Sequence, residues 1–326
     1  MSNWLITGGC GFIGSSLIQE LVASDQKINI RVLDNLSVGT KEDLSGACEF
    51  QEVTSEDMGS SPKGIELFVG DICDEQTCLT SAIGVDVIVH LAANTGVGPS
   101  VEMPRVDMEA NVIGVFNMLE AARSNGVDKF IFASSGAPIG ELIAPPIHEE
   151  LAAHPVSPYG ASKLAGEGYC SAYFQTYGVN TIVLRFGNVY GPGSEKKESV
   201  VAKFIKLAKK GEVCEIYGKG SQTRDFIYIS DLVDAICKSD KANVGGEVFQ
   251  IASNKEVTVN EIAELIKEKL KGFGVDLELT YGEARAGDVM RNYSDTSKAK
   301  LVLDWVSKTN LDVGLDKTIS SFCNLS

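Results

Sequence analysis

Short, mostly apolar runs alternate with segments of helical spacing along this chain as far as Phe186. We interpret the apolar runs as strands, at Trp4–Thr7, Ile30–Leu33, Glu66–Val69, Val85–His90, Phe130–Ala133 and Thr181–Phe186. Helical spacing of apolar residues occurs at Ser15–Ala23, Val112–Ser124 and Leu164–Tyr177. Strands that are apolar on both faces are typical of a parallel sheet covered by helices on both sides. We therefore predict an α/β fold with a doubly wound parallel sheet, in which ligands lie at the carboxyl ends of the strands.

The pattern changes after Gly187, where a stretch rich in glycine and proline precedes the charged run 195–198. We predict that a smaller C-terminal lobe starts there. In it, Val257–Gly272 is expected to form a charged amphipathic helix capped by Thr258, and the tail from Leu301 is expected to be helical. The predicted division assigns residues 1–187 and 224–252 to the larger lobe, and residues 188–223 and 253–326 to the smaller one.

Composition excludes several classes of function. The formal net charge of −15 over 326 residues argues against a nucleic-acid-binding protein, because such proteins present basic patches to phosphates. No apolar run approaches the ~20 residues that cross a bilayer, and no signal peptide is evident, so we expect a soluble cytoplasmic protein without membrane contact. The eight cysteines include no Cys-x-x-Cys pair and only three histidines are present, so neither a metal site nor a disulfide framework is expected.

A glycine-rich segment, Thr7-Gly8-Gly9-Cys10-Gly11-Phe12-Ile13-Gly14, joins the first predicted strand to the first predicted helix. Glycines let the backbone turn tightly and approach a pyrophosphate, which the helix N-terminus then faces. Asp34 ends the second strand twenty residues after Gly14, where a carboxylate accepts hydrogen bonds from ribose hydroxyls and repels a 2′-phosphate. The alternatives are a tight turn for the glycines and a turn with Asn35 for Asp34. Together the two features predict a Rossmann domain that binds NAD rather than NADP.

Two later strand ends supply less specific cofactor candidates. Asp71-Ile72 follows the third strand and is expected to hold the adenine, and Leu91-Ala92-Ala93 follows the fourth and lets the backbone pass close to the cofactor. His90 has no second histidine or carboxylate at ligand spacing. We therefore interpret His90 as a packed residue at a strand end rather than as a catalytic group.

The candidate catalytic residues lie around the start of a later helix. Tyr159 and Lys163 are four residues apart and share a helix face, with Pro158 in the first turn. A phenol loses its proton near pH 10, and a neighbouring ammonium and a positive nicotinamide ring both favour the phenolate, so Tyr159 is predicted to be the base. Taken singly, such a pair is more often found on the surface. Ser135, after the fifth strand, is predicted to hydrogen-bond the reacting hydroxyl, with Ser134 as the alternative.

These motifs occur in a recognisable order over nearly the whole chain. They are the glycine segment, Asp34-Asn35-Leu36-Ser37, His90-Leu91-Ala92-Ala93, Ser134-Ser135, Tyr159 with Lys163, Arg185-Phe186-Gly187-Asn188-Val189-Tyr190-Gly191-Pro192 and Arg224-Asp225-Phe226-Ile227. In order and spacing they are similar to the UDP-glucose 4-epimerase branch of the extended short-chain dehydrogenase/reductase family. The resemblance implies an NAD-dependent nucleotide-sugar epimerase with a UDP-sugar between its lobes. It also implies a homodimer that pairs helices around Val112–Ser124 and Tyr159–Tyr177.

Motif positions of that family also imply which residues bind the two ligands. The implied cofactor-binding residues are Gly8, Gly11, Phe12, Ile13, Gly14, Asp34, Asn35, Ser37, Gly39, Asp71, Ile72, Leu91, Ala92, Ala93, Asn111, Ser134, Tyr159, Lys163, Phe186 and Val189. The implied substrate-binding residues are Asn94, Ser135, Tyr159, Asn188, Val200, Tyr217, Arg224, Arg285, Asp288 and Asn292. Arg224 and Arg285, with Asn188, are expected to hold the diphosphate, because a guanidinium makes paired hydrogen bonds to phosphate oxygens. The alternative for each arginine is a surface ion pair.

The chain departs from the family pattern at two places. The residues after the catalytic serine are Gly136-Ala137-Pro138-Ile139-Gly140, without the tyrosine that the family commonly has before the glycine. The loop after the fourth strand, Asn94-Thr95-Gly96-Val97-Gly98, lacks a lysine that is often found there. The shape of the sugar pocket and the phosphate contacts are therefore expected to differ.

The same positions bear on the reaction. Dehydratase relatives have an Asp-Glu pair after the catalytic hydroxyl residue, whereas this chain has Gly136 and Ala137, so no acid is evident for a leaving hydroxyl. We therefore expect 4-epimerisation through a 4-keto sugar. The alternatives are a 4-uronate epimerase or 2-epimerase, and a catalytically silent, NAD-bound regulatory protein, which the set Ser135, Tyr159 and Lys163 argues against.

Asn292 is the residue that constrains substrate breadth. It aligns with a pocket-wall position that is bulky in relatives restricted to plain hexoses and smaller in those that accept N-acetyl sugars. We expect activity on UDP-N-acetylglucosamine and UDP-N-acetylgalactosamine as well as on UDP-glucose and UDP-galactose. The alternative is an ordinary loop residue that faces water.

Overall fold

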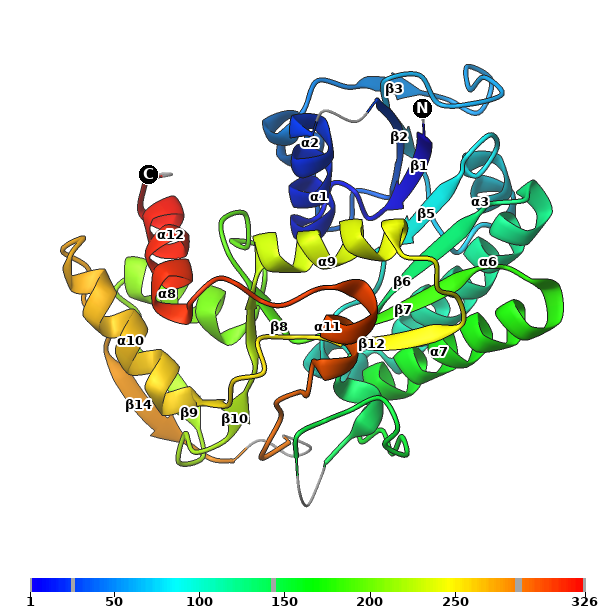
Figure 1. The fold of residues 1–326 in the computed structure, drawn as a ribbon. Coiled ribbons are helices and arrows are strands. Elements are labelled where there is room, and N and C mark those ends of the chain that lie inside the picture. The colour runs from blue at the N-terminus through cyan, green and yellow to red at the C-terminus, as the bar shows by residue number, and fades with distance from the viewer. Residues whose placement is uncertain (1, 25–26, 142–144, 285–288, 325–326) are drawn as a thin grey trace. The chain divides into compact units, whose positions relative to one another are not determined.

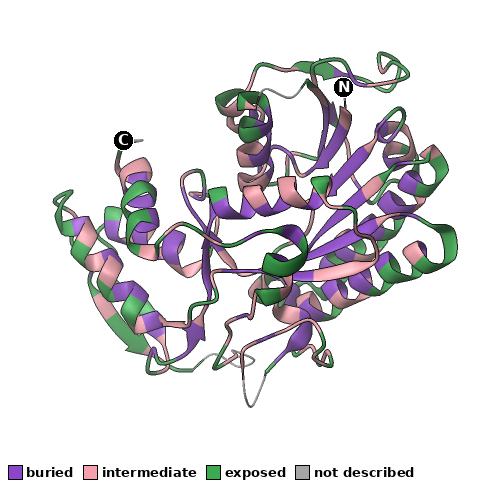
Figure 2. Ribbon diagram, viewed as in Figure 1, coloured by how far each residue is buried: buried purple, intermediate pink, exposed green. Residues whose placement is uncertain are grey.

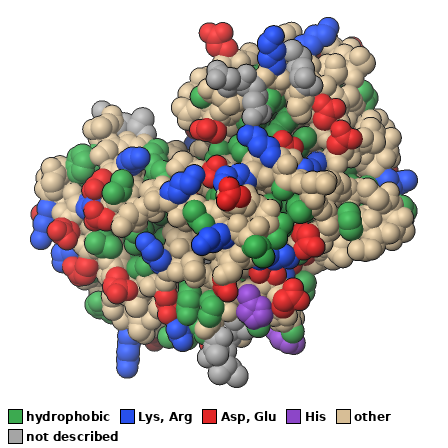
Figure 3. Space-filling model, viewed as in Figure 1, with side chains coloured by type: hydrophobic (Ala, Val, Ile, Leu, Met, Phe, Trp, Pro, Cys, Tyr) green, Lys and Arg blue, Asp and Glu red, His purple; other side chains and the backbone are tan. Residues whose placement is uncertain are grey.

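The structure, a computed structural model, describes residues 2–24, 27–141, 145–284 and 289–324 (Figure 1). The chain forms two compact units. The first unit contains Met1–Pro138, Ala153–Arg185 and Ile236–Phe249, and the second contains Ile139–Ala152, Phe186–Ala235 and Gln250–Ser326. None of the helices within the described ranges has the length and apolarity that spanning a membrane requires. Figure 3 shows acidic and basic side chains interspersed over one face of the molecule.

An eight-stranded sheet has the strand order β12-β7-β6-β5-β1-β2-β4-β3. Its strands are β1 (Ser2–Thr7), β2 (Ile28–Asp34), β3 (Gln51–Val53), β4 (Ile65–Val69), β5 (Val87–His90), β6 (Lys129–Ser135), β7 (Thr181–Phe186) and β12 (Glu247–Ile251). Neighbouring strands from β3 to β6 pair in parallel. The chain order reverses between β1 and β5, so their carboxyl ends flank the position where doubly wound folds bind ligands.

Helices cover both faces of this sheet. Figure 1 shows α1 (Phe12–Ala23) on one side of the strands, and α3 (Glu75–Ser81), α6 (Gly114–Asn125) and α7 (Pro158–Tyr177) on the other. Because both faces are covered, the strands are buried over most of their length (Figure 2). Leu5, Ile6, Ile88 and Val89 are inaccessible to solvent. The predicted doubly wound parallel sheet is therefore confirmed.

The remaining elements of the first half are short. They are α2 (Lys41–Ala47), α4 (Val97–Glu102), α5 (Pro104–Met108), the π-helical turn η1 (Glu109–Ile113) and the 3-10 turn η2 (Ala137–Ile139). All six apolar strands predicted from the sequence agree with the structure to within two residues at either end. The sequence analysis missed β3 and β12, which lie at the two edges of the sheet. Edge strands lack one neighbour, so their apolar pattern is weaker.

The second unit consists of small sheets and helices. It contains β8 (Asn188–Tyr190), β9 (Cys214–Tyr217), β10 (Thr223–Arg224), β11 (Phe226–Tyr228), β13 (Val257–Thr258) and β14 (Leu279–Gly282). Its helices are α8 (Val200–Lys209), α10 (Val259–Lys271), α11 (Ser297–Leu303) and α12 (Leu311–Asn324). Helix α9 (Ile229–Lys241) begins in this unit and continues into the first one. Thr258 caps α10 and exchanges hydrogen bonds with Glu261, as the sequence predicts for the cap.

Two buried carboxylates organise this unit. Asp225 accepts hydrogen bonds from the backbone of Ser253 and Asn254 and from the Ser253 hydroxyl. Asp231 accepts from the backbone of Lys308 and Thr309 and from two nearby hydroxyls. A buried carboxylate is stable when donors surround it, so these two residues tie distant segments of the unit together.

Segment 139–152 was predicted to belong to the larger lobe, but the structure places it in the second unit. Ile147 forms two backbone hydrogen bonds there, from its N–H to Tyr293 and from the N–H of Asp295, each 2.8 Å long. The Glu149 carboxylate also accepts from the backbone of Gln250 at 2.7 Å. Residues 224–235 and 250–252 belong to the second unit as well. Such long-range pairing has no local sequence signature.

We predict that Glu66→Ala destabilises the protein by about 3–5 kcal/mol, because it leaves the buried Arg31 guanidinium without its carboxylate partner. Arg31 is inaccessible to solvent, and its Nη2 lies 3.1 Å from Glu66 Oε2. The matched control is Glu52→Ala, whose ion pair with Lys41 is exposed and should contribute under about 1 kcal/mol. Chemical denaturation of both variants measures the difference, and equal losses would contradict the prediction.

Candidate functional site

The loops after β1 and β5 are held together by one threonine. The hydroxyl of Thr7 lies 2.8 Å from Nδ1 of His90 and accepts hydrogen bonds from the backbone N–H groups of Leu91 and Ala92. Burial lowers the pKa of His90 to about 3, with the Lys163 charge acting in the same direction. His90 therefore stays neutral, and its ring packs against Phe132. These contacts agree with its interpretation as a packed residue at a strand end.

The glycine segment forms a cradle that larger residues would fill. Gly8 has a φ of +69°, and a Cβ there would lie 2.8 Å from the backbone nitrogen of Ala92. A Cβ on Gly14 would lie 2.4 Å from the carbonyl oxygen of Gly8, and one on Gly39 would lie 2.3 Å from Cys10. No side chain caps the N-terminus of α1 at Gly11. A helix N-terminus without a side-chain cap and the close glycine contacts fit a bound pyrophosphate.

Asp34 lies at the end of β2 beside this cradle. Its Oδ2 accepts from the backbone N–H of Cys10 at 2.9 Å, and its Oδ1 accepts from that of Leu36 at 2.9 Å. Burial raises the pKa of Asp34, and the two backbone hydrogen bonds oppose this rise. The bonds fix the orientation of the carboxylate beside the cradle, in a place suited to accept from a ribose hydroxyl.

The neighbouring strand end carries a second acidic group. Asn35 Nδ2 donates to Asp71 Oδ2 at 2.9 Å, which joins the loop after β2 to the loop after β4. The other oxygen of Asp71 accepts from the backbone of Cys73. Most of the predicted cofactor residues lie in the first unit. Phe186 and Val189 belong to the second unit.

Ser135 and Tyr159 meet at the end of β6. The Ser135 hydroxyl forms a hydrogen bond with the Tyr159 phenol. Ser157 caps α7 by accepting from the backbone N–H of Gly160, and Pro158 occupies the first turn. A Cβ on Gly160 would lie only 2.6 Å from the carbonyl oxygen of Ala137, so the start of α7 packs directly on the segment after Ser135. This packing brings the phenol to the serine.

The protonation state of Tyr159 depends strongly on its surroundings. Burial raises the pKa of Tyr159 to about 12, the hydrogen bond from Ser135 acts in the opposite direction, and the charge of Asp107 adds to the rise. The nearby ammonium expected from the sequence is that of Lys163, whose Nζ lies 5.9 Å from the centre of the Tyr159 ring. Burial outweighs that charge, so a further positive charge is needed for the phenolate to form near neutrality.

Lys163 is buried below Tyr159 on the same helix. Its Nζ donates to the carbonyl oxygen of Ala133 at 2.9 Å and lies 5.0 Å from the centre of the Phe132 ring. Burial lowers the pKa of Lys163 to about 8, and the carboxylates of Asp107 and Glu167 oppose this effect. Burial therefore makes this ammonium easier to deprotonate than that of an exposed lysine.

Sequence reasoning missed Glu167. Its carboxylate accepts from the Ser134 hydroxyl at 2.5 Å and forms a buried ion pair with Arg185, with Oε2 2.6 Å from Nη2. Ser134 therefore points to Glu167, which favours Ser135 over Ser134 as the catalytic hydroxyl. The available signal was spacing, since Glu167 lies four residues after Lys163.

Asn111 holds the loop after β5 through two hydrogen bonds to its backbone. Its Oδ1 accepts from the backbone N–H of Asn94 at 2.8 Å, and its Nδ2 donates to the Asn94 carbonyl oxygen at 2.8 Å. The same amide nitrogen lies 2.9 Å from Asp107 Oδ1 and 3.2 Å from the Ser162 hydroxyl. Asn111 lies in the π-helical turn η1, a departure from α-helical geometry that is frequent at functional sites. Asp107 was also missed from sequence, although it precedes Asn111 by one helical turn.

Several predicted substrate residues lie in the second unit. Arg224 Nη1 donates to the carbonyl oxygens of Thr223 and Val289, and the backbone N–H of Asn292 lies 3.4 Å from the Thr223 hydroxyl. Asn188 pairs with β11, and Lys203 Nζ lies 5.4 Å from the ring centre of Tyr217. Val200 begins α8. Arg285 and Asp288 lie outside the described residues.

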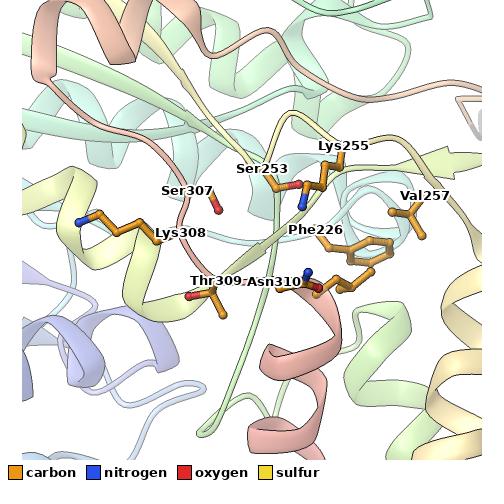
Figure 4. Close-up of a pocket in the computed structure, with 9 residues that line it drawn as sticks. Phe226, Ser253, Lys255, Val257, Ser307, Lys308, Thr309 and Asn310 are labelled. Atoms are coloured by element: carbon orange, nitrogen blue, oxygen red, sulfur yellow. The ribbon is translucent and has the colours of Figure 1, made fainter.

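The second unit also contains a pocket of about 240 Å³, distinct from the predicted substrate residues. It is lined by Phe226, Ser253, Lys255, Val257, Ser307, Lys308, Thr309, Asn310 and Leu311 (Figure 4). The hydroxyls of Ser253, Ser307 and Thr309 donate to Asp225 or Asp231. Three of the polar side chains that line the pocket therefore serve as hydrogen-bond donors to the buried carboxylates of this unit.

Comparisons with other proteins show similarity over the whole chain. A family model described as the NAD dependent epimerase/dehydratase family matches residues 4–252. A UDP-glucose 4-epimerase from Mycolicibacterium smegmatis is 34% identical over 326 residues, or 99% of each chain. The solved structure of a UDP-glucose 4-epimerase from Thermotoga maritima with UDP-glucose is 35% identical, with a TM-score of 0.88 over 99% of both chains. A second solved structure is that of a UDP-N-acetylglucosamine 4-epimerase from Methanobrevibacter ruminantium in complex with UDP-N-acetylmuramic acid. It is 28% identical, with a TM-score of 0.88 over 100% of this chain and 99% of that chain.

We predict that Gly14→Ala weakens NAD binding by about tenfold or more, a loss of at least ~1.4 kcal/mol, because the added methyl group would displace the backbone of the glycine segment. The matched control is Gly46→Ala in α2, where an added Cβ meets nothing within 4 Å. The NAD content of the purified proteins and titration calorimetry measure the effect. Retention of normal NAD content by Gly14→Ala would show that the cradle does not hold the cofactor.

Proposed function

Because the chain belongs to the NAD-dependent epimerase/dehydratase family, we propose that it is a UDP-sugar 4-epimerase whose main substrates are UDP-glucose and UDP-galactose. The observation that carries this proposal is the grouping of Ser135, Tyr159 and Lys163 at the end of β6, in the same unit as the glycine cradle. This arrangement suits proton removal from a sugar hydroxyl held next to NAD.

In the proposed reaction each residue has one task. Ser135 hydrogen-bonds the C4 hydroxyl of the sugar, Tyr159 removes its proton, and the Lys163 ammonium stabilises the phenolate. Bound NAD would supply the hydride acceptor for C4, the source of the returning hydride, and a positive charge next to the phenol. That charge opposes the burial which raises the pKa of Tyr159 to about 12.

The residues after Ser135 favour epimerisation over dehydration. Gly136 and Ala137 occupy the positions where an acid would protonate a leaving hydroxyl.

Asn292 supports a broad substrate range, since its backbone is held by Thr223 next to Arg224, and its side chain is small. A 4-epimerase of UDP-glucuronate is the alternative substrate assignment. A catalytically silent NAD-bound protein is the alternative of a different class, and it has no need for a hydrogen-bonded serine and tyrosine.

We also propose a homodimer formed through α6 and α7. Phe116 and Tyr169 are partly exposed on these helices, and their rings contact each other with centroids 5.7 Å apart. Tyr177, which is 56% exposed, extends the same aromatic row through Tyr173. Burial of these aromatic side chains against a second copy would remove a large apolar area from water.

Tyr159→Phe is expected to lower turnover by at least about a thousandfold, which corresponds to ~4 kcal/mol of transition-state stabilisation, while NAD and UDP-sugar binding stay nearly intact. Only the proton acceptor is removed. The control is Tyr281→Phe, which makes the same chemical change at an exposed side chain. Steady-state rates and ligand titrations separate the two effects. Retention of a tenth of wild-type turnover would exclude Tyr159 as the base.

The redox balance of the reaction provides the direct test of function. Purified protein without added NAD, given UDP-glucose, UDP-N-acetylglucosamine or UDP-glucuronate, is expected to convert at least one to its 4-epimer, because the hydride that is taken is also returned. NMR of the sugar products measures conversion. Accumulation of NADH in proportion to product would identify a dehydrogenase, and the absence of any turnover would favour the silent protein.

The same substrates test the role of Asn292. Asn292→Tyr is expected to reduce turnover of UDP-N-acetylglucosamine by about tenfold or more and to spare UDP-glucose, because a filled pocket rejects the larger sugar. Asn260→Tyr serves as a control of the same chemical change in the second unit, on helix α10. Equal effects of Asn292→Tyr on both substrates would show that this residue does not line the sugar pocket.

A further inference from the structure

One buried carboxylate near the catalytic residues has no assigned role. Asp107, on α5, is 1% exposed. Its Oδ1 accepts from Asn111 Nδ2 at 2.9 Å, whereas its Oδ2 has no hydrogen-bond partner among the described residues. A buried carboxylate is costly unless it is fully paired, so structural carboxylates of folded proteins are usually surrounded by donors. Asp225 and Asp231 follow that rule, and Asp107 does not.

The bonded oxygen of Asp107 orients Asn111. An amide nitrogen carries two hydrogens, and the two shortest contacts of Asn111 Nδ2 are with the Asn94 carbonyl oxygen at 2.8 Å and with Asp107 at 2.9 Å. A carboxylate accepts hydrogen bonds but cannot donate them when ionised, so Asp107 permits only the amide orientation that points Nδ2 toward it. That orientation directs Oδ1 to the backbone N–H of Asn94. Asp107 thereby fixes the loop after β5.

The charge of Asp107 acts on Lys163. Two carboxylates raise the pKa of this lysine against the effect of burial, and Asp107 contributes more than Glu167. Glu167 is already neutralised by Arg185, whose Nη2 lies 2.6 Å away. Of the two carboxylates, Asp107 therefore has the larger effect on the buried Lys163 ammonium.

We infer that Asp107 is a positioning residue of the proposed reaction, which orients Asn111 through one oxygen and balances the buried Lys163 ammonium with its negative charge. The inference rests on the proposed function insofar as it takes Tyr159 and Lys163 as the reacting pair. Asp107 acts through Lys163 and through the Asn94 loop.

The expected pH dependence follows from the charges around Lys163. The titratable groups that face it are Asp107 from α5, Tyr159, Glu167 and Cys170 from α7, and His90 from β5. His90 is neutral, and burial raises the pKa of Cys170, so neither carries charge near neutrality. Because the Asp107 charge raises the pKa of Lys163, its removal should lower that pKa further below about 8. The ammonium would then be lost at lower pH.

The test compares Asp107→Asn, which keeps the size and one acceptor oxygen but removes the charge, with Glu109→Gln. Glu109 lies two residues away on an exposed surface, so the control makes the same change in charge outside the site. NMR titration of protein labelled at its lysine side chains follows Lys163 directly and needs no turnover. Lys197 also has a pKa lowered to about 8, so Lys163→Met assigns the signal.

We expect Asp107→Asn to lower the titration midpoint of Lys163 by about one pH unit, as neighbouring charges do at close range. Glu109→Gln should leave the midpoint in place. The alkaline limb of the pH profile of kcat should move in the same direction and by a similar amount, with KM for the UDP-sugar little changed. Asp107→Ala removes the same charge and leaves room for water beside Asn111, so it provides the same test if the asparagine variant does not fold.

The outcomes separate this inference from the proposed function. An unchanged Lys163 midpoint in folded Asp107→Asn or Asp107→Ala would overturn the inference, and so would a uniform loss of kcat at all pH values with the alkaline limb unmoved. A lowered midpoint in a protein that converts no UDP-sugar would support the inference about Asp107 while contradicting the proposed epimerase activity.

Discussion

The hydrogen bond between Thr7 and His90 is the contact on which the site depends. The two residues pair across β1 and β5, at the point where the strand order reverses. The Thr7 hydroxyl also accepts from the backbone after His90, so the two loops that leave these strands cannot move independently. The Gly8 turn approaches Ala92 so closely that a side chain on Gly8 would not fit. The cradle is thus a consequence of parallel pairing and of close backbone packing at the carboxyl ends of β1 and β5.

A second constraint is electrostatic, because α7 carries charged residues into the interior. Lys163 and Glu167 are both buried on this helix, and each is balanced from another element. Arg185 of β7 pairs with Glu167, and Asp107 of α5 acts on Lys163. Burial alone would favour the neutral forms of both Lys163 and Tyr159. At Lys163, the neighbouring carboxylates oppose this effect.

The parts of the fold that the sequence predicted are those whose signal is local. Apolar runs identified the central strands because both of their faces are buried, and Pro158 and the capping residue Thr258 marked the starts of α7 and α10. The edge strands β3 and β12 lacked such a signal. Segment 139–152 was misassigned because it joins the second unit by backbone pairing of Ile147 with residues 293 and 295, which no periodicity reveals.

The sequence by itself determined the doubly wound sheet, the glycine segment with Asp34, and the spacing of Tyr159 and Lys163, because each follows from backbone freedom, strand burial or helix geometry within a short stretch of chain. Only the tertiary structure decided which of two adjacent serines faces Tyr159, and that Asp107 and Glu167 lie near Lys163. Those outcomes depend on the packing of α5, α7 and β6, elements that are distant in sequence. Coulomb and desolvation energies depend on distance and burial in space, and neither quantity is encoded by local sequence spacing.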